Sequence, residues 1–317
     1  MSDLGLHRWA QPRVILVATD LTDLDRLIPF ALQQAQQSGA RIILLHVLNA
    51  GASLAPDATG MPYYDPAGAI DFAIKTLEPW RSKARAQEIA CDAVVREGPS
   101  AQQIIATARQ FNADRLLLGT RSRSKVSKLL LGSVAEQVLR SVNLPVITVG
   151  PEAHLKVEDG ARQRVVLHAT TLRETSSPSA ALACQIALTQ KARLVLLHVL
   201  PPIDEMQREH LPTGLESTAI RELRILAAEI SVSESCCAQV DVRVAHGHPA
   251  IEILAASAEL NAHLIVLGSA HHSILHNLTH DRTVYRVLAH ARCPVMTLRD
   301  VDEETSPLPA EHDKISL

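Results

Sequence analysis

The stretch "ARIILLHVL" at residues 40–48 returns as "ARLVLLHVL" at residues 192–200, and the two copies are identical at seven of nine positions. The offset is 149 residues between Gly119 and Gly268 and 152 residues between His46 and His198. A repeat of this length predicts two domains of one kind, produced by duplication. Further pairs of similar stretches are "RVILVATD" (13–20) with "RVVLHATT" (164–171), "ADRLLLGT" (113–120) with "AHLIVLGS" (262–269), and "LPVITVG" (144–150) with "CPVMTLR" (293–299).

Each copy alternates short runs rich in Val, Ile and Leu with longer segments of helical composition. Continuous apolar strands are typical of a parallel sheet that helices cover on both faces. The sequence therefore predicts an α/β fold of two tandem flavodoxin-like or Rossmann-like domains, each with a five-stranded parallel sheet. Residues 49–66, which contain Gly, Pro and Asp, are expected to form an exposed loop. In the first half, strands are expected at 13–19, 41–48, 92–96, 114–119 and 145–149.

The polar segment between the two copies predicts the domain boundaries. Residues 1–150 form the expected first domain, residues 151–163 the linker and residues 164–299 the second domain. Residues 300–317 contain six acids, one lysine and two prolines, so an acidic and disordered tail is expected there.

Composition excludes several classes of function. The chain has 317 residues, a net charge of −3 and only 3% aromatic residues, which argues against nucleic-acid binding. No apolar run approaches the roughly 18 residues of a membrane span, and the start "MSDLGLHRWAQPR" lacks the apolar core of a secretion signal. A cytoplasmic protein without a membrane partner is expected.

The expected strand ends bring a candidate phosphate site together. In a parallel sheet, ligands bind outside the carboxyl ends of the strands where the strand order reverses, which places Thr19 and Asp20 close to Gly119. The following loop carries four cations and no acid, and Gly132 and Ser133 then open a helix. The first turn of a helix offers unpaired N–H groups and positive potential, so polyphosphate is the best chemical match. The simpler alternative is a solvated basic loop in which Ser133 caps its helix.

The spacing of this loop resembles the nucleotide loop of the universal stress protein family. Gly119, two residues, Ser122, nine residues, then Gly132, Ser133 and Val134 follow the family pattern of GxxG, nine residues, then Gly and Ser or Thr. The strand ending in Asp20, the "LLHV" strand, the "GPSAQQI" turn and the closing "LPVITVG" also match in order. The resemblance covers both halves.

The resemblance implies a strand order of 3-2-1-4-5 in each domain and pairing of the domains through their fifth strands. A homodimer of the whole chain is left open. The implied ligand is ATP, AMP or ADP, with Mg²⁺ accompanying ATP. The site residues expected at the base, ribose and phosphates are Thr19, Asp20, Val47, Gly119, Arg121, Ser122, Gly132, Ser133 and Val134.

One position departs from the family pattern. Ser122 stands where the family has its second glycine. If that position requires a positive φ, a serine there costs on the order of 1 kcal/mol, although its hydroxyl could also donate to a phosphate.

The second half is expected to have lost this site. Asp20 becomes Thr171, while Asp281 and Arg282 replace Gly132 and Ser133. An aspartate at a helix start repels phosphate, so the second domain is expected to act as a structural or regulatory partner. Its histidines at 272, 276 and 280 have the spacing of a zinc, nickel or copper site on a helix, but exposed histidines without a role are the simpler interpretation. His46 and His198 are interpreted as structural.

Enzyme signatures are scarce. The chain has no GxGxxG, Walker, GxSxG or HExxH motif, and the loop contains no evident general base. The predicted function is therefore nucleotide binding in a stress or regulatory role. A scaffold or small-ligand carrier that needs no nucleotide, and a weak ATPase, are the alternatives.

Overall fold

A computed structural model provides the structure of the chain. It describes residues 3–49, 55–56, 62–63, 65–120, 131–153, 163–172, 178–202, 214–233, 239–270 and 280–300.

The first domain is built on five parallel strands in the order β5-β2-β1-β6-β7. Numbered along the domain, this is 3-2-1-4-5, as the resemblance implied. The predicted strand positions are confirmed to within one residue. β1, β2, β6 and β7 are short apolar runs that are almost entirely buried, whereas β5 lies at the sheet edge and is mostly half-buried. The strands are β1 (Val14–Thr19), β2 (Arg41–Leu48), β5 (Cys91–Glu97), β6 (Arg115–Gly119) and β7 (Val146–Val149).

The second domain repeats this order with strands β10-β9-β8-β11-β12. The predicted α/β fold with two tandem domains is confirmed. The strands are β8 (Val165–Ala169), β9 (Arg193–Leu200), β10 (Val240–His246), β11 (Leu264–Ala270) and β12 (Val295–Asp300).

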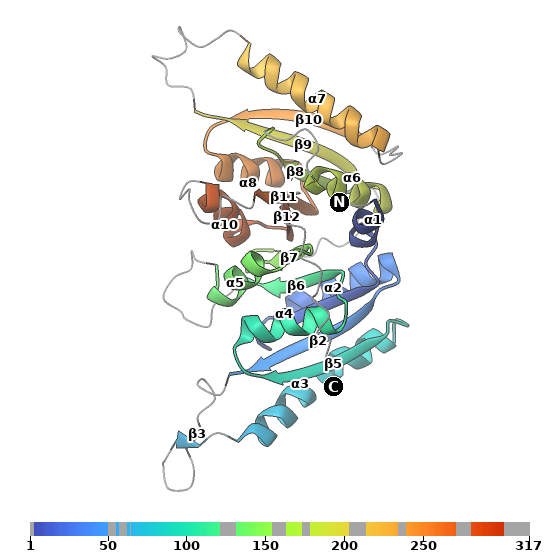
Figure 1. The fold of residues 1–317 in the computed structure, drawn as a ribbon, viewed down its shortest axis with the longest axis vertical. Coiled ribbons are helices and arrows are strands. Elements are labelled where there is room, and N and C mark those ends of the chain that lie inside the picture. Colours follow the sequence, from blue (N-terminus) through green and yellow to red (C-terminus); the bar gives the residue numbers. More distant parts are fainter. Residues whose placement is uncertain are drawn as a thin grey trace, which may run out of the picture.

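The two fifth strands join the domains. β7 pairs with β12 in antiparallel register, so the two five-stranded sheets merge into one mixed sheet of ten strands (Figure 1). Hydroxyls of Thr148 and Thr297 donate across this seam to the carbonyls of Val295 and Val146, at 3.3 and 3.4 Å. The seam covers an edge strand of each sheet that would otherwise expose unpaired backbone groups.

Helices cover both faces of the sheet (Figure 1). On one face a single apolar cluster runs through both domains, while on the other face each domain has a cluster of its own. The helices are α2 (Leu24–Ser38), α3 (Pro66–Arg85), α4 (Ser100–Gln110), α5 (Ser133–Ser141), α6 (Pro178–Thr189), α7 (Leu215–Ser233), α8 (Pro249–Glu259) and α10 (His280–His290).

Helix α2 illustrates why the apolar pattern forms these elements. Leu24, Leu27, Ile28 and Ala31 recur at helical spacing and are all buried against the sheet. Gly39 ends the helix at φ 70°, a left-handed conformation that glycine adopts without steric cost, and its N–H donates to the carbonyl of Ala35.

Two elements were not predicted from the sequence. Helix α1 (Asp3–Ala10) packs against α6 of the second domain, and the buried guanidinium of Arg115 donates to the Trp9 carbonyl at 2.6 Å. The stretch expected to be an exposed loop contains a short antiparallel pair, β3 (Ala55–Pro56) with β4 (Pro62–Tyr63).

Candidate functional site

The carboxyl ends of β1, β2 and β6 and the amino-terminal end of α5 enclose a cavity of about 290 Å³. This volume lies near the lower end of the roughly 300–1,000 Å³ that is typical of small-molecule sites. Seven of the residues predicted from the sequence line this one cavity, although they come from four separate segments of the chain. They are Thr19, Asp20, Val47, Gly119, Gly132, Ser133 and Val134.

The walls of the cavity combine apolar and polar groups. Leu45, Leu48, Ile104 and Leu118 contribute apolar surface, and Val134 is 38% exposed although it is apolar. Such a lining suits a ligand with a flat apolar part and a polar end, because the apolar walls bury one part while a few polar groups orient the other. The remaining lining residues are Ala18, Asp23, His46, Asn49, Ser100 and Ala135.

A tight turn after β1 positions the first polar groups. The hydroxyl of Thr19 accepts a hydrogen bond from the backbone N–H of Leu21 at 2.9 Å, and Leu21 has a left-handed φ of 72°. The Asp20 carboxylate accepts from the N–H and the hydroxyl of Thr22, at 2.8 and 2.6 Å. These bonds hold Asp20 at the rim, because a short polar side chain can satisfy the backbone two residues ahead of it.

Asp23 is a buried carboxyl in this cavity that sequence reasoning missed. Its Oδ1 accepts from the Thr19 hydroxyl at 2.6 Å, and the side chain is 6% exposed. Burial raises the pKa of Asp23 to about 6; the Thr19 hydrogen bond lowers this pKa and the nearby charge of Asp20 raises it. The signal that could have found Asp23 is its place directly before α2, where Asp is common as a helix start.

Asp23 explains the glycine at the end of β6. A Cβ added to Gly119 would overlap the Oδ2 of Asp23. Position 119 therefore requires a residue without a side chain. Asp23 sets this requirement, although it lies far from Gly119 in the sequence.

The start of α5 forms the opposite wall. Gly132 precedes the helix in an extended conformation, φ −62° and ψ 142°, and its N–H donates to the carbonyl of Thr120 at 3.2 Å. Glycine has no side chain to cap the helix, so the first-turn N–H groups of Ser133, Val134 and Ala135 are available to an anion. The hydroxyl of the exposed Ser133 adds a donor at this end of the cavity.

The matching strand end in the second domain keeps the turn but not the carboxylate. The Thr170 hydroxyl accepts from the N–H of Leu172 at 3.1 Å, and Leu172 has a φ of 59°. Thr171 stands at the place of Asp20.

The two histidines expected to be structural each bond to the backbone of this turn. Nδ1 of His46 lies 2.9 Å from the Thr19 carbonyl, and Nδ1 of His198 lies 2.9 Å from the Thr170 carbonyl. A carbonyl can only accept, so Nδ1 carries the proton in both residues.

Several predicted residues lie outside the described part of the chain. These are Arg121 and Ser122 of the nucleotide loop and His272 and His276 of the histidine group. His280 begins α10, but its side chain is not described. Among the described residues, no group of three or more His, Cys, Asp or Glu could hold a metal ion.

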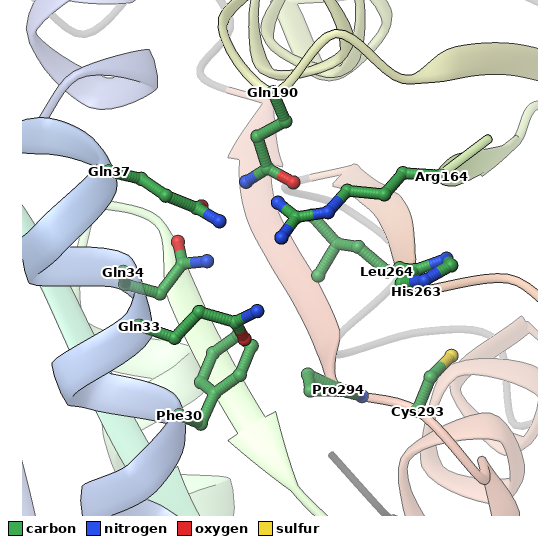
Figure 2. Close-up of a pocket in the computed structure, with 10 residues that line it drawn as sticks. All are labelled: Phe30, Gln33, Gln34, Gln37, Arg164, Gln190, His263, Leu264, Cys293 and Pro294. Carbon is green, nitrogen blue, oxygen red and sulfur yellow. The ribbon is translucent and has the colours of Figure 1, made fainter. Parts of the chain in front are cut away.

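A second cavity of about 30 Å³ lies between the domains (Figure 2). Its volume suffices for one or two water molecules and excludes a nucleotide. Gln33, Gln34 and Gln37 of α2 face Arg164 across it. With the Gln37 oxygen turned toward the guanidinium, it accepts from Nη1 and Nη2 of Arg164 at 2.5 and 3.2 Å. This cavity is part of the polar contact between the domains.

The comparisons with known proteins identify one family, and it is the same in both halves of the chain. The model of the universal stress protein family matches residues 12–150 and again residues 163–299. A Thermus aquaticus protein named "Universal stress protein in QAH/OAS sulfhydrylase 3'region" is 30% identical over 144 residues, which cover 43% of this chain and 98% of that protein.

Some solved structures resemble nearly the whole chain, and others resemble less than half of it. A universal stress protein from Archaeoglobus fulgidus is similar over 92% of this chain and 100% of its own, with a TM-score of 0.65 and 23% identity, which shows the fold alone. The structure of an Archaeoglobus fulgidus universal stress protein in complex with dAMP is 22% identical over 44% of this chain and 98% of its own. Its TM-score of 0.33 is too low to support a statement about a ligand of this chain.

No helix in the described part of the chain is long and apolar enough to cross a membrane.

Proposed function

We propose that this chain, which belongs to the universal stress protein family, binds ATP or a related adenine nucleotide in the cavity of its first domain. The observation that carries the proposal is the convergence of Thr19, Asp20, Val47, Gly119 and the Gly132–Val134 segment on one cavity. Each end of that cavity offers different chemistry, and both ends suit parts of a nucleotide.

The apolar end suits a base and a sugar. Val47 and Ile104 offer aliphatic surface to a planar ring, and the Asp20 carboxylate at the rim can accept hydrogen bonds from ribose hydroxyls or an exocyclic amine. Gly119 makes room for the Asp23 carboxylate beside this end of the cavity.

The polar end suits phosphates. The first-turn N–H groups of α5 and the Ser133 hydroxyl would hold phosphate oxygens, with the positive end of the helix dipole adding to the attraction. Arg121 and Ser122 complete the proposed site on the sequence pattern. Where Mg²⁺ accompanies ATP, phosphate oxygens and water would supply most of its ligands, because the cavity-lining carboxylates Asp20 and Asp23 belong to the turn after β1 and not to the start of α5.

The second domain, in this proposal, is a structural or regulatory partner without a nucleotide. Thr171, Asp281 and Arg282 replace the groups that would hold base and phosphates. The β7–β12 pairing would make the chain a pseudo-dimer within one polypeptide, acting in the cytoplasm in a stress-response role.

A direct experiment tests the proposal. Freshly purified protein is denatured, released small molecules are identified by mass spectrometry, and the refolded or nucleotide-free protein is titrated with ATP, ADP, AMP and GTP by calorimetry. Binding of an adenine nucleotide below millimolar concentration, with weaker binding of GTP, is expected. Failure of every adenine nucleotide to bind at that level would favour the scaffold or small-ligand carrier instead.

A weak ATPase is the second candidate, and Asp23 is the observation that favours it. A carboxylate with a pKa of about 6 has the proton affinity of a general base. Asp23 lines the cavity beside Thr19 and Gly119, so it would act on the phosphates only if the bound ATP brought them to that wall. The test is phosphate release from bound ATP, compared between the wild type and Asp23→Asn. Binding without any turnover would eliminate this candidate.

A further inference from the structure

Helix α5, which opens the proposed phosphate end of the cavity, rests on both domains. Leu131 and Leu139 pack against the apolar cluster of the first domain and also against the cluster of the second domain. Every other residue of that second cluster belongs to the second domain. These two leucines therefore connect the helix to the neighbouring core, one directly before Gly132 and one two turns later.

Polar contacts at the carboxyl end of α5 add to this connection. The Tyr285 hydroxyl of α10 lies 3.4 Å from Arg140 Nη2 and 3.5 Å from Glu136 Oε1, and these two α5 side chains form an ion pair at 2.7 Å. Arg299 of β12 donates to the Arg140 carbonyl at 2.8 Å. A cation at a helix carboxyl end is favourable, because that end carries negative potential.

The amino-terminal end of α5 is held close to the same surface. Gly132 donates to the carbonyl of Thr120, which is buried, and Thr120 in turn faces Gly150. A Cβ added to Gly150 would lie 3.3 Å from the Leu288 carbonyl of α10 and 3.7 Å from the Thr120 hydroxyl. The backbone around the start of α5 is thus packed between the two domains.

At the proposed base and ribose end of the cavity, three buried apolar lining residues belong to the first-domain cluster alone. They are Leu45 of β2, Ile104 of α4 and Leu118 of β6. Among the described residues, the first-domain members packed on the second-domain cluster are Leu131 and Leu139, and both lie on the α5 side of the cavity.

We infer that the second domain, through Tyr285 and the Leu131–Leu139 contact, positions α5 for the phosphates of a nucleotide bound in the first domain. This inference rests on the proposed function and assigns a role to the domain that lacks its own site. Tyr285 is a positioning residue, because it acts through α5 and does not line the cavity. Loss of its contact would let the first-turn N–H groups of α5 shift away from the phosphate oxygens, since hydrogen bonds weaken steeply with misalignment.

The experiment compares ATP with adenosine, which lacks phosphates. Affinities for both ligands are measured by calorimetry for the wild type, Tyr285→Ala, Tyr285→Phe and the control Ile251→Ala, an exposed second-domain residue on α8. Tyr285→Ala is expected to weaken ATP binding roughly three- to thirtyfold and to leave adenosine binding within about twofold. Tyr285→Phe keeps the ring on the second-domain cluster but removes the hydroxyl contacts with Arg140 and Glu136, so its ATP affinity should lie between those of the wild type and Tyr285→Ala. Ile251→Ala should retain all of the ATP affinity.

The outcomes separate this inference from the proposed function. Equal loss of ATP and adenosine affinity in Tyr285→Ala, or no loss of either, would overturn the positioning role while leaving nucleotide binding intact. Absence of binding to the wild type by either ligand would overturn both. Thermal unfolding of each variant shows whether the second domain remains folded, and Leu139→Ala offers a second variant from the α5 side of the contact.

Discussion

The two domains share the turn after the first strand but not its chemistry. Thr19 and Thr170 accept hydrogen bonds from the N–H groups of Leu21 and Leu172, and both leucines have a positive φ. A left-handed leucine is uncommon and costs on the order of 1 kcal/mol, so its presence in both halves indicates that the turn is required by the fold.

The same comparison distinguishes residues that support the fold from residues that face the cavity. The histidine of the second strand bonds to the turn carbonyl in both domains, at 2.9 Å in each. By contrast, the residue that follows the threonine is Asp20 in one domain and Thr171 in the other. Backbone support was therefore kept after duplication while the groups facing the cavity changed.

Each domain buries an ionisable side chain whose pKa is shifted by its burial. The first domain buries the Asp23 carboxyl at the cavity, where Thr19 donates to it. The second domain buries His168 inside β8, at the place of Val17 in the first copy. Nδ1 of His168 donates to the Val266 carbonyl at 3.0 Å, while its Nε2 is buried without a hydrogen-bond partner in the described part of the chain. Asp23 and His168 are thus a buried acid and a buried base, and burial favours the neutral form of each. The first domain also buries the basic side chains of Arg115 and His46.

The largest expected effect comes from placing at position 132 of the first domain the aspartate that the second domain has at the matching position, 281. Gly132→Asp should weaken ATP binding by more than about 100-fold, because a like charge next to phosphate costs several kcal/mol. Calorimetric titration measures the affinity, and circular dichroism verifies the fold. Gly132→Ala is the control, since the extended backbone at this position accepts any residue. Wild-type affinity in Gly132→Asp would place the phosphates elsewhere.

The contact of Gly119 with Asp23 gives the next prediction. Gly119→Ala should lower the free energy of unfolding by about 2–3 kcal/mol, because the added Cβ overlaps the buried Asp23 carboxylate. Urea unfolding measures the loss. In the double variant Gly119→Ala with Asp23→Ala, more than about 1 kcal/mol should be recovered, because the overlapping group is gone. Strict additivity of the two substitutions would contradict the contact.

His168→Val replaces the buried histidine of the second domain with the residue that the first domain has at the matching position, Val17. Burial lowers the pKa of His168 to about 4, against 6.5 for an unperturbed histidine. Between these pH values the unfolded chain binds more protons, so the wild type loses stability as the pH falls from about 6.5 to about 4. The variant should be more stable by about 1–2 kcal/mol at pH 7, because Nε2 is no longer buried without a partner, and by about 2 kcal/mol more at pH 5.

Urea unfolding across this pH range measures the difference. Val17→Ala is a matched control in β1 that removes apolar volume without removing a titratable group. An unchanged pH dependence in His168→Val would mean that His168 is not buried as a neutral imidazole.

Asp23→Asn should change the pH dependence in the opposite direction by a similar amount. The folded pKa of Asp23, about 6, lies above the ordinary value of 3.8, so the folded chain binds more protons between these pH values. The protonated Asp23 therefore contributes to the stability of the wild type at low pH, and this contribution is lost as the pH rises through about 6. Asparagine does not titrate, so the variant has no such loss of stability. The variant should gain about 2 kcal/mol at pH 7 relative to its stability at pH 4, compared with the wild type over the same interval. Equal slopes for the two proteins would contradict the buried carboxyl.

Much of the fold could be predicted because its signals are local. The four inner strands of the first domain are largely apolar runs, as a parallel sheet covered on both faces requires, and the repeat of residues 40–48 indicated a second domain of the same kind. The family predicted from the loop spacing is confirmed by the match to both halves. Seven predicted residues line one cavity because the carboxyl ends of parallel strands meet at one edge of the sheet.

What escaped prediction depends on distant contacts. Helix α1 has eight residues, too few to be stable alone, and it packs against α6 of the other domain. Asp23 lies beside Gly119 although 96 residues separate them in the sequence.

The sequence by itself determined the duplication, the strand order through the family resemblance, and the polar residues at the strand ends. Only the tertiary structure decided that Gly119 must lack a side chain because of Asp23, and that α5 rests on the second domain through Leu131 and Leu139. The physical reason is that propensity and hydrophobic period act along the chain, whereas overlap, burial and the pKa of a buried group depend on which atoms fill the neighbouring space.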